Sequence, residues 1–388
     1  MPGMYRGSLM QQIISYMSAG ESHGPAEVLM IRGLPAGFHL DIDALDRQLQ
    51  RRQQGYGRGG RMRIEKDEVR VLSGLRHGIT LASPLTLMIE NKDHARWRKE
   101  MDPLQGEAQS KVRVPRPGHA DFAGAAKYGF DDIRNVLERA SARETAARIL
   151  AGAVCRQFLE ELGMRLGSYL IRLADVRCPD MQPGEELFRK AEESDVRCPD
   201  PKSAELMRKA IDKAKAAGDS LGGIFRVAVL GLPPGLGSYV HWDEKLTSRI
   251  AAEIMGIQAV RGIAFGAGFE GAGLSGSAYH DIFVIEKERI KRATNRAGGL
   301  EGGMSNGEVL QFDAVMKPIP TLTSPLDSFN MDTMKKVTAH QERSDVCALP
   351  AAAVVAENLC AVPLLNALLL RYGADRWDHI LRRVKEDA

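Results

Sequence analysis

Apolar and polar residues alternate over short segments near the start of the chain, a pattern typical of strands. The apolar runs Ile13-Ile14 and Val28–Ile31 flank a glycine-bounded turn at residues 20–25. The sequence therefore predicts two strands joined by that turn. Two more apolar runs, Val69–Leu72 and Leu85–Glu90, predict further strands. A small sheet is expected in this part of the chain.

Helical spacing of apolar residues recurs in several later segments. Asp41 is suited to cap a helix whose apolar residues share one face and which ends before Gly55. The apolar positions of Ile133–Leu162 predict one long helix that Gly163 ends. Helices are also predicted for Pro201–Ala217, for the residues after Asp243, which would cap them, and for Leu349–Leu370.

The most apolar segment, Leu349–Leu370, contains the polar residues Glu357, Asn358 and Asn366 as well as Pro363. Such residues argue against a membrane span, so the segment predicts one or two buried helices. The first residues lack the apolar run of a secretion signal. We therefore expect neither export nor a membrane partner.

The composition is that of a globular protein, because 44% of the 388 residues are hydrophobic and 27% are charged. The 53 Lys and Arg residues and 50 Asp and Glu residues give a formal charge of +3, which argues against nucleic acid as the partner. The 5 cysteines form no CxxC pair, so we expect no metal, no disulfide framework and a cytoplasmic location. The expected organisation is a single domain over residues 1–388, with flexible ends at 1–12 and 380–388.

Two segments have unusual sequences. The hexapeptide DVRCPD occurs at Asp175–Asp180 and again at Asp195–Asp200. Two copies are too few for a solenoid, but they could mark a duplicated strand–turn unit. Residues 262–307 are dense in glycine and are interrupted by the apolar run Ile282–Ile285. This density predicts backbone packed closely against a ligand or another chain.

Basic residues gather in three groups that lie beside Gly, Pro or His. Guanidinium groups are permanent planar donors suited to phosphate and carboxylate, and glycines among them let backbone amides approach a ligand. Together the groups favour a small polyanionic ligand over a solvated basic surface, while RNA stays an alternative. They are Arg51, Arg52, Arg58, Arg61 and Arg63 in a Gly-rich loop; Lys111, Arg113 and Arg116; and Arg139 with Arg143, one helical turn apart.

Two histidines lie in loop-like sequence among Gly, Pro and Arg. His23 follows Ser22 in GESHG, and His119 lies two residues before Asp121. A loop histidine can accept or donate a proton near neutral pH, so both are candidate acids or bases. Asp345, in RSDVC, is either a helix cap or a carboxylate near a cationic or proton-transferring centre.

Several common patterns match without the surroundings that they need. Gly266–Gly271 fits GxGxxG, but the residues after it do not predict a helix. GESHG and Gly303–Gly307 fit GxSxG, yet strand-like sequence follows the first, and a serine hydrolase stays an alternative. The Pro-rich Lys317–Thr321 predicts a fixed connection or an anion or cofactor contact. The residues alone support an enzyme that binds a small anion and moves protons with one or two histidines.

Taken together, the motifs resemble those of the chorismate synthase family. They occur in the family's order from about residue 16 to residue 370, and no single short pattern carries the resemblance. They are GESHG, RRQQGYGRGGRM, PLTLMIENKD, RPGHAD, RASARET, GIQAVRG, RAGGLEGGMSNGE, KPIPTL and RSDVC.

The resemblance implies a mixed α/β (α+β) fold, in which a single large β-α-β sandwich domain has long buried helices between its sheet layers, and it implies a homotetramer. It also implies a lyase of the shikimate pathway, which supplies aromatic amino acid biosynthesis. This enzyme removes phosphate and a C6 hydrogen from 5-enolpyruvylshikimate-3-phosphate by 1,4-elimination to give chorismate. The family needs reduced FMN, for which we expect an external reductant. One phosphate and two carboxylates on the substrate agree with the three basic groups.

Carried over motif by motif, the resemblance implies individual roles. His23 would protonate the departing phosphate, His119 would handle a proton at the reduced flavin, and Asp345 would accept or relay the flavin's proton. The family also links Arg52 and Arg58 to NADP. Substrate contacts would come from Ser22, Arg52, Arg58, Arg116, Ser141, Arg143 and Arg343. FMN contacts would come from Arg139, Ala140, Ser141, Gln258, Ala259, Gly302, Lys317, Pro318, Ile319, Pro320, Thr321 and Arg343.

Overall fold

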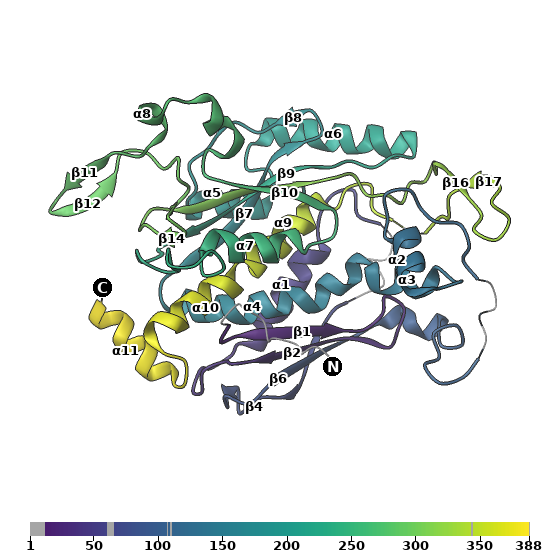
Figure 1. The fold of residues 1–388 in the computed structure, drawn as a ribbon, viewed down its shortest axis with the longest axis horizontal. Coiled ribbons are helices and arrows are strands. Elements are labelled where there is room, and N and C mark those ends of the chain that lie inside the picture. The colour runs from purple at the N-terminus through teal and green to yellow at the C-terminus, as the bar shows by residue number, and fades with distance from the viewer. Residues whose placement is uncertain (1–11, 60–65, 107, 109–110, 343, 388) are drawn as a thin grey trace, which may run out of the picture.

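The chain folds into two antiparallel sheets with a layer of helices between them (Figure 1). The computed structural model describes residues 12–59, 66–106, 108, 111–342 and 344–387. The smaller sheet has the order β1 (Ser15–Ala19), β2 (Ala26–Arg32), β6 (Leu85–Glu90) and β3 (Val69–Ser73). The larger has the order β10 (Val260–Phe265), β15 (Leu310–Met316), β9 (Gly223–Leu230), β7 (Arg165–Leu173) and β8 (Val176–Arg177).

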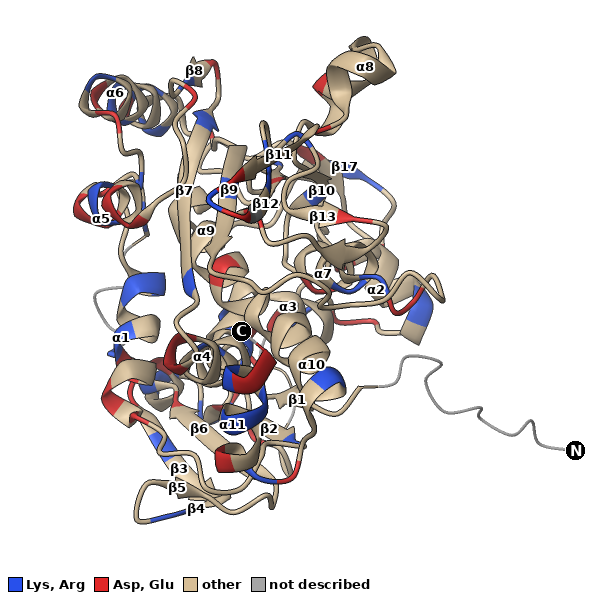
Figure 2. Cartoon of the chain, turned by 90° about the vertical axis from the view of Figure 1, so that its left-hand side faces the viewer, with Lys and Arg blue, Asp and Glu red and all other residues tan. Residues whose placement is uncertain are grey.

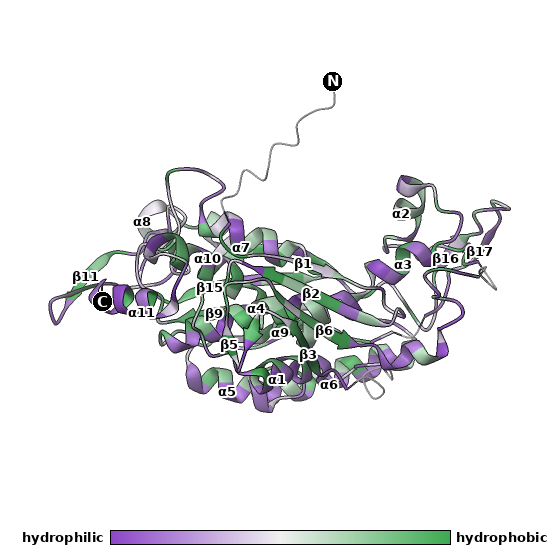
Figure 3. Ribbon diagram, turned by 90° about the horizontal axis from the view of Figure 1, so that it is seen from below, coloured by the Kyte–Doolittle hydropathy of each residue, from purple (hydrophilic) through white to green (hydrophobic). Residues whose placement is uncertain are grey.

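The middle layer consists of four helices: the amphipathic α1 (Ile42–Gln53) and the largely buried α4 (Thr145–Glu161), α9 (Leu349–Leu359) and α10 (Ala361–Tyr372). Helix α4 packs on β2 and β6, whereas α9 packs on β7 and β9. Every residue of α9 is buried, as expected for a helix that is apolar on all sides. Figure 3, which views the sandwich from below, shows the largely hydrophobic α4 and α9 near its centre. The arrangement is the mixed β-α-β sandwich that the family resemblance implies.

Helices α4 and α9 approach each other closely at Gly152. A β-carbon at this position would lie 2.2 Å from the backbone oxygen of Asn358, so only glycine allows this separation. One continuous hydrophobic core contains side chains from both sheets and from the middle layer. The single-domain expectation stays a prediction, and this shared core favours it.

Smaller elements surround the sandwich. Helix α5 (Glu185–Glu193) packs on β7 through a separate apolar cluster, whereas α6 (Pro201–Ala217) contacts β8 and contributes Met207 and Ile211 to the main core. The other helices are α2 (Asp121–Tyr128), α3 (Arg134–Ala140), α7 (Leu246–Met255), α8 (Gly276–Tyr279) and α11 (Trp377–Asp387), with the 3₁₀ turns η2 (Lys92–Arg96), η3 (Ala142–Glu144) and η4 (Gly268–Gly273). The two-stranded sheets are β4 (Leu75–Arg76) with β5 (Ile79–Thr80), β11 (Phe283–Glu286) with β12 (Arg289–Arg292), β13 (Leu300–Glu301) with β14 (Met304–Ser305), and β16 (Asp327–Phe329) with β17 (Lys336–Thr338).

Most of the predicted elements are confirmed. Helix α1 begins after Asp41, whose side chain accepts a hydrogen bond from the backbone of Ala44 at 3.1 Å. Helix α6 begins at Pro201 and ends at Gly218, which has the left-handed conformation with φ +70°. Helix α7 exists, but Asp243 does not cap it, because its N-cap is Lys245.

The prediction of one helix over Ile133–Leu162 is wrong. The segment divides into α3, η3 and α4, and the interruption lies at Ser141, which is extended with φ −62° and ψ 143°. The Ser141 side chain accepts from the backbone N–H of Arg143 at 3.3 Å, the kind of local bond that competes with helix. As predicted, the helical segment ends at Gly163, which has φ +86°.

The C-terminal segment forms buried helices, as predicted. Leu349–Tyr372 is long and apolar enough to cross a membrane, but 94% of its most apolar window is buried inside the protein. Residues 380–387 belong to α11, and Ile380 is buried in the core. This does not fit the expected flexible end at 380–388. The other expected flexible end, at 1–12, lies outside the described residues except for Gln12.

Candidate active site

A cavity of about 500 Å³ brings together most of the residues that the sequence singles out. They come from loops and helix ends that are far apart in the sequence. The predicted residues that line it are Ser22, His23, Arg52, Arg58, Arg116, His119, Ala140, Ser141, Arg143, Gln258, Ala259, Lys317, Ile319, Pro320, Thr321 and Asp345.

Arg52 and Arg143 form the most deeply buried cationic part of this cavity. Arg143 donates to Asp67 at 2.8 Å, and Arg52 lies 3.8 Å from the same carboxylate. Arg52 also donates to the hydroxyl of Thr145 at 2.9 Å. Burial lowers the pKa of Arg52 to about 10, so the group still carries its charge at neutral pH. Among the described residues, Nη1 of Arg52 and Nη2 of Arg143 are buried without a hydrogen-bond partner.

Arg58 and Asp345 face each other across the cavity's edge. Nη1 of Arg58 lies 2.7 Å from Oδ2 of Asp345, and the backbone N–H of Gly59 donates to Oδ1 at 2.6 Å. A β-carbon on Gly59 would lie 2.8 Å from the backbone oxygen of Ser344. The helix-cap alternative for Asp345 is therefore wrong. Helix α9 starts at Leu349, and Asp345 instead holds the loop that follows α1.

His23 lies in the turn between β1 and β2, where Glu138 of α3 fixes its ring. Nδ1 of His23 lies 2.9 Å from Oε1 of Glu138, and the backbone N–H of His23 donates to Oε2 at 2.8 Å. Burial raises the pKa of Glu138, but the hydrogen bonds and charge of His23 and Arg134 outweigh it, so the pKa is lowered. The ring of Trp97 stacks on His23 at 4.1 Å. With Nδ1 engaged, Nε2 is the nitrogen left for a ligand.

His119 belongs to a second hydrogen-bonded group. Its Nδ1 lies 2.5 Å from Oδ1 of Asp121 and 3.0 Å from Nη2 of Arg116. Arg116 also binds Asp121 through Nε at 2.8 Å and Thr321 through Nη1 at 3.0 Å. Burial raises the pKa of Asp121, yet the bonds from His119 and Arg116 hold it well below the usual range. Asp121 thus orients both side chains toward the cavity.

Some predicted residues lie elsewhere. Arg139 and Arg143 do not share a helix face, because the chain turns at Ser141. Arg139 points outward and donates to the backbone oxygen of Gly20 at 3.0 Å. Gly302, in the β13–β14 turn with φ +60°, and Pro318 do not line the cavity of this chain. Arg343 lies outside the described residues, as do Arg61 and Arg63.

Sequence reasoning missed three residues that support the site: Glu138, Trp97 and Asp67. Glu138 is 115 positions from His23, and Asp67 is 76 positions from Arg143. No periodicity links residues so far apart. The only available signal is that Glu138 lies within the segment that also carries Arg139 and Ser141.

The segments that match GxSxG and GxGxxG lack the local structure that these motifs need for their function. GESHG lies between β1 and β2, and Gly303–Gly307 is followed by β15, so neither has the strand-before, helix-after geometry of a nucleophile elbow. Gly266–Gly271 runs from the end of β10 into the 3₁₀ turn η4. A dinucleotide site would need an α-helix there.

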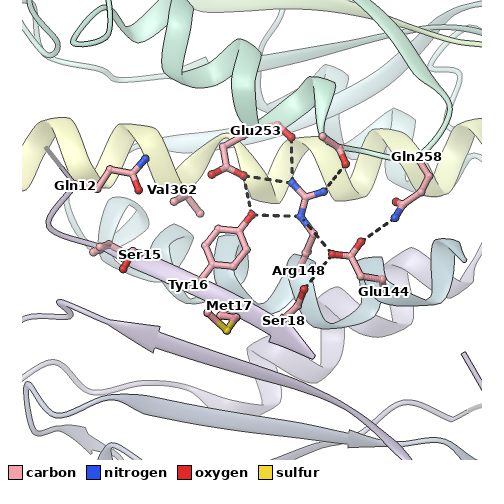
Figure 4. A pocket seen from close by; sticks show the side chains of 12 residues that line it. Gln12, Ser15, Tyr16, Met17, Ser18, Glu144, Arg148, Glu253, Gln258 and Val362 are labelled. Carbon is pink, nitrogen blue, oxygen red and sulfur yellow. Dashed lines mark hydrogen bonds and ion pairs between the residues drawn. The ribbon is translucent and has the colours of Figure 1, made fainter. Parts of the chain in front are cut away.

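A second cavity, of about 630 Å³, lies between β1, α4 and α7 (Figure 4). Tyr16 donates to Glu253 at 2.7 Å, and Arg148 donates to the backbone oxygen of Gly256 at 2.7 Å. Gln258, which lines both cavities, donates to Glu144 at 2.8 Å. Because these groups are paired with one another, we assign this cavity a structural role.

The first cavity also has an apolar side, which Leu137, Ile257, Ala351, Ala352 and Val355 form. Helices α4 and α9 both begin at the cavity, so their amino ends face it. Cationic and apolar walls together suit a flat ring system that carries anionic groups. In the described part of the chain, the buried Oε1 of Gln258 has no hydrogen-bond partner. The residues present therefore fit a flavin beside an anionic substrate.

The sandwich and a cavity with both cationic and apolar walls are those of an enzyme that acts on a small polyanion. The family model for chorismate synthase matches residues 14–369. A chorismate synthase from Geobacillus sp. (strain WCH70) is 50% identical over 378 residues, covering 96% of this chain and 97% of the relative. One from Trichlorobacter lovleyi is 49% identical over 379 residues, covering 95% and 96%.

A solved structure is also similar. The crystal structure of a chorismate synthase superimposes with a TM-score of 0.77 at 34% identity, and covers 97% of both chains. The chain belongs to the chorismate synthase family. As a member, it is a flavin-dependent lyase of the shikimate pathway that converts 5-enolpyruvylshikimate-3-phosphate to chorismate.

Proposed function

We propose that the elimination takes place in the cavity lined by His23, Arg52 and Asp345. One observation carries this proposal: arginines from separate segments converge beside a histidine whose Nδ1 is already engaged by Glu138. A polyanion needs several fixed cations, and a leaving phosphate needs a proton donor. The cavity offers both.

The arginines bind the substrate's phosphate and carboxylates in this proposal. Arg52 and Arg143 each keep a buried N–H group without a hydrogen-bond partner among the described residues. A buried donor without a partner is costly, so a bound anion would relieve this cost. Ser22 and Ser141, whose hydroxyl oxygens lie 3.1 Å apart, add hydroxyl contacts. Arg58 and Arg116 line the same cavity, and Arg343 is proposed from its motif alone.

His23 protonates the departing phosphate through Nε2. Glu138 accepts from Nδ1–H, which leaves Nε2 to face the leaving group. His119 would handle a proton through Nε2, and the carboxylate of Asp345 would accept or relay the proton of the flavin. Asp121 fixes the first and Arg58 the second.

We propose FMN as the flavin. Two groups of residues that line the cavity would hold it. They are Ala140, Ser141, Gln258 and Ala259, and Lys317, Ile319, Pro320 and Thr321. Lys317 donates to the backbone oxygen of Gly118 at 2.5 Å, which places its amine beside His119. Reduced FMN, when bound, supplies electron density to the substrate as phosphate leaves. Arg139, Gly302 and Pro318 do not line this cavity and contribute only if the site extends beyond it.

We propose a homotetramer, supported by the exposed apolar hairpin β11–β12. Phe283, Ile285 and Ile290 are 66%, 79% and 72% exposed. The hairpin projects from the sandwich in Figures 1 and 3. Large exposed apolar side chains gathered in this way mark protein–protein contacts. Sedimentation of the wild type and of Ile285→Asp tests the assembly, and a monomeric wild type would contradict it.

An external reductant is proposed for the flavin, because Gly266–Gly271 lacks the helix of a nicotinamide dinucleotide site. The link of Arg52 and Arg58 to NADP stays a prediction, since both side chains face the cavity assigned to the substrate. A cytoplasmic location is proposed from the free thiols of all the cysteines.

Anaerobic turnover of 5-enolpyruvylshikimate-3-phosphate with chemically reduced FMN tests the proposal. Chorismate absorbance and released phosphate should rise together. His23→Ala should lower turnover far more than substrate binding. Replacing the exposed His379 by Ala gives the matched control, which should behave as wild type. Full turnover by His23→Ala would remove His23 from the mechanism.

A further inference from the structure

The two DVRCPD copies place Cys178 and Cys198 at equivalent positions of the repeat. The copies do not form a duplicated strand–turn unit. The first contains β8, and the second is the connection between α5 and α6. The structural meaning of the repeat must therefore lie in where its side chains meet.

Both copies are anchored on adjacent residues of β7. The backbone N–H of Cys178 donates to Ile171 at 2.9 Å, and the carbonyl of Arg197 accepts from Leu170 at 2.9 Å. The register of β7 shifts between Leu170 and Arg172, so a bulge lies where the two copies meet. Figures 1 and 2 show β8 beside α6.

A third contact closes this junction. The hydroxyl of Ser203, in the first turn of α6, donates to the backbone oxygen of Arg177 at 3.3 Å. Sγ of Cys198 lies 3.6 Å from the backbone oxygen of Asp200. The backbone of Cys178 and that of Arg197, the residue before Cys198, thus contact neighbouring residues of β7, which brings the two thiols to one site held by three elements.

The two thiols differ in access and acidity. Cys178 is partly exposed, whereas Cys198 is only 2% exposed. The Cys198 thiol beside it lowers the pKa of Cys178, whereas the neighbouring Cys178 thiol and burial raise the pKa of Cys198. Exposure and a low pKa are what make a cysteine reactive. Cys178 is therefore the expected nucleophile of the pair.

The remaining cysteines have the opposite character. Cys155, Cys347 and Cys360 are buried. Burial raises the pKa of all three thiols, that of Cys347 to about 11. They should stay protonated and inaccessible under conditions in which Cys178 reacts.

We propose that Cys178 and Cys198 form a dithiol site that a low-molecular-weight disulfide oxidises to an intramolecular disulfide. The Cys178 thiolate attacks one sulfur of the small disulfide and releases a first small thiol. Cys198 then gives up its proton and attacks the Cys178 sulfur, which releases a second. The two protein thiols are oxidised, the small disulfide is reduced to two thiols, and the two protein protons end on those products.

The test uses the full-length protein and glutathione disulfide at about pH 8, where a thiol of this kind is partly ionised. After an acid quench, unfolding and alkylation, mass spectrometry should find that two of the 5 thiols have been lost. Peptide mapping should find a disulfide bond between the peptide that contains Cys178 and the peptide that contains Cys198. Five alkylated thiols, or a bridge between other cysteines, would overturn the proposal.

Single variants separate the two steps. Cys198→Ser should retain one glutathione on Cys178, because no neighbouring thiol can displace it. Cys178→Ser should take up none, and Cys360→Ser should form the bridge as wild type does. Glutathione on a cysteine other than Cys178 in the first variant would contradict the assignment. The peptide map of the wild type stands independently of how well each variant folds.

Discussion

Glu138 holds His23 at two atoms, the ring Nδ1 at 2.9 Å and the backbone nitrogen at 2.8 Å. The first contact fixes which ring nitrogen faces the cavity, and the second fixes the turn that carries the ring. Arg134 extends the group, because it donates to Glu138 at 3.1 Å and lies over Trp97 at 4.8 Å. The position of the proposed proton donor thus depends on a helix far away in the sequence.

Glu138→Gln tests this dependence. The amide keeps the shape of the carboxylate, but its NH2 group cannot accept one of the two hydrogen bonds that Glu138 accepts from His23. We expect turnover to fall about 10- to 100-fold, the usual effect of losing a charge-assisted hydrogen bond. Glu161→Gln, whose carboxylate accepts from Trp377 outside the cavity, is the control, and unchanged turnover of Glu138→Gln would contradict the role.

Arg52→Lys tests substrate binding. Lysine retains the charge but cannot reach Thr145 and the backbone of Ala142 while presenting a further N–H to the cavity. We expect the KM for the substrate to rise about 10- to 100-fold. Arg47→Lys changes an exposed arginine of the same helix, paired with Asp41, and should leave KM unchanged. An unchanged KM for Arg52→Lys would remove Arg52 from the anion site.

Glu27→Gln should change how stability depends on pH. Burial raises the pKa of Glu27 to about 7, although Arg143 and Arg139 lower it in part. The folded state therefore holds this proton more tightly than the unfolded state, so wild-type stability falls as pH rises from about 4.5 to about 7. Glutamine removes this loss.

The difference in the free energy of unfolding between Glu27→Gln and wild type should grow across that pH range. It should reach about 3 kcal/mol in favour of the variant. Urea unfolding at pH values on either side of the range measures it. A difference that does not change with pH would show that Glu27 is charged in the folded protein throughout.

Glu357→Gln should destabilise the protein. The carboxylate of Glu357 is fully buried and pairs with Arg51, Arg156 and Arg197. Burial raises its pKa, but these guanidinium groups outweigh that effect and hold the pKa well below the usual range. Removing the charge leaves the three guanidinium groups with only the partly exposed carboxylates of Glu160 and Glu192, and loss of a buried ion-pair partner costs about 3–5 kcal/mol.

Denaturant unfolding measures this cost. Glu193→Gln removes an exposed carboxylate that pairs with Arg189 and should change stability by less than about 0.5 kcal/mol. Equal stability of the two variants would show that the arginines of the buried cluster are satisfied by other groups. Figure 2 shows α5, which carries Glu192 of this cluster, beside the basic end of α1.

Local signals predicted those elements whose boundaries depend on neighbouring residues. Asp41 and the apolar face that follows it predicted α1, and Pro201 with Gly218 predicted α6. The interruption at Ser141 was missed because no Gly or Pro marks it. Its cause is a side-chain hydrogen bond to Arg143, which the apolar pattern around it does not reveal.

In the candidate site, too, some residues could be predicted from local sequence and others could not. Arg52, His23 and His119 could be predicted because unusual residue types gather in short segments. Their partners Glu138 and Asp67 could not, because only the folded chain brings them near. Residues proposed to meet the substrate left a trace in local composition, whereas the residues that hold them in place did not.

The amino ends of α4 and α9 point at the cavity from inside the sandwich. Their aligned peptide dipoles give that end of each helix a partial positive charge. Peptide groups do not titrate, so this contribution persists at every pH at which the middle layer stays folded. Attraction for an anion in this cavity is thereby partly independent of any side chain, so substitution of a single arginine would weaken the cavity's potential without abolishing it.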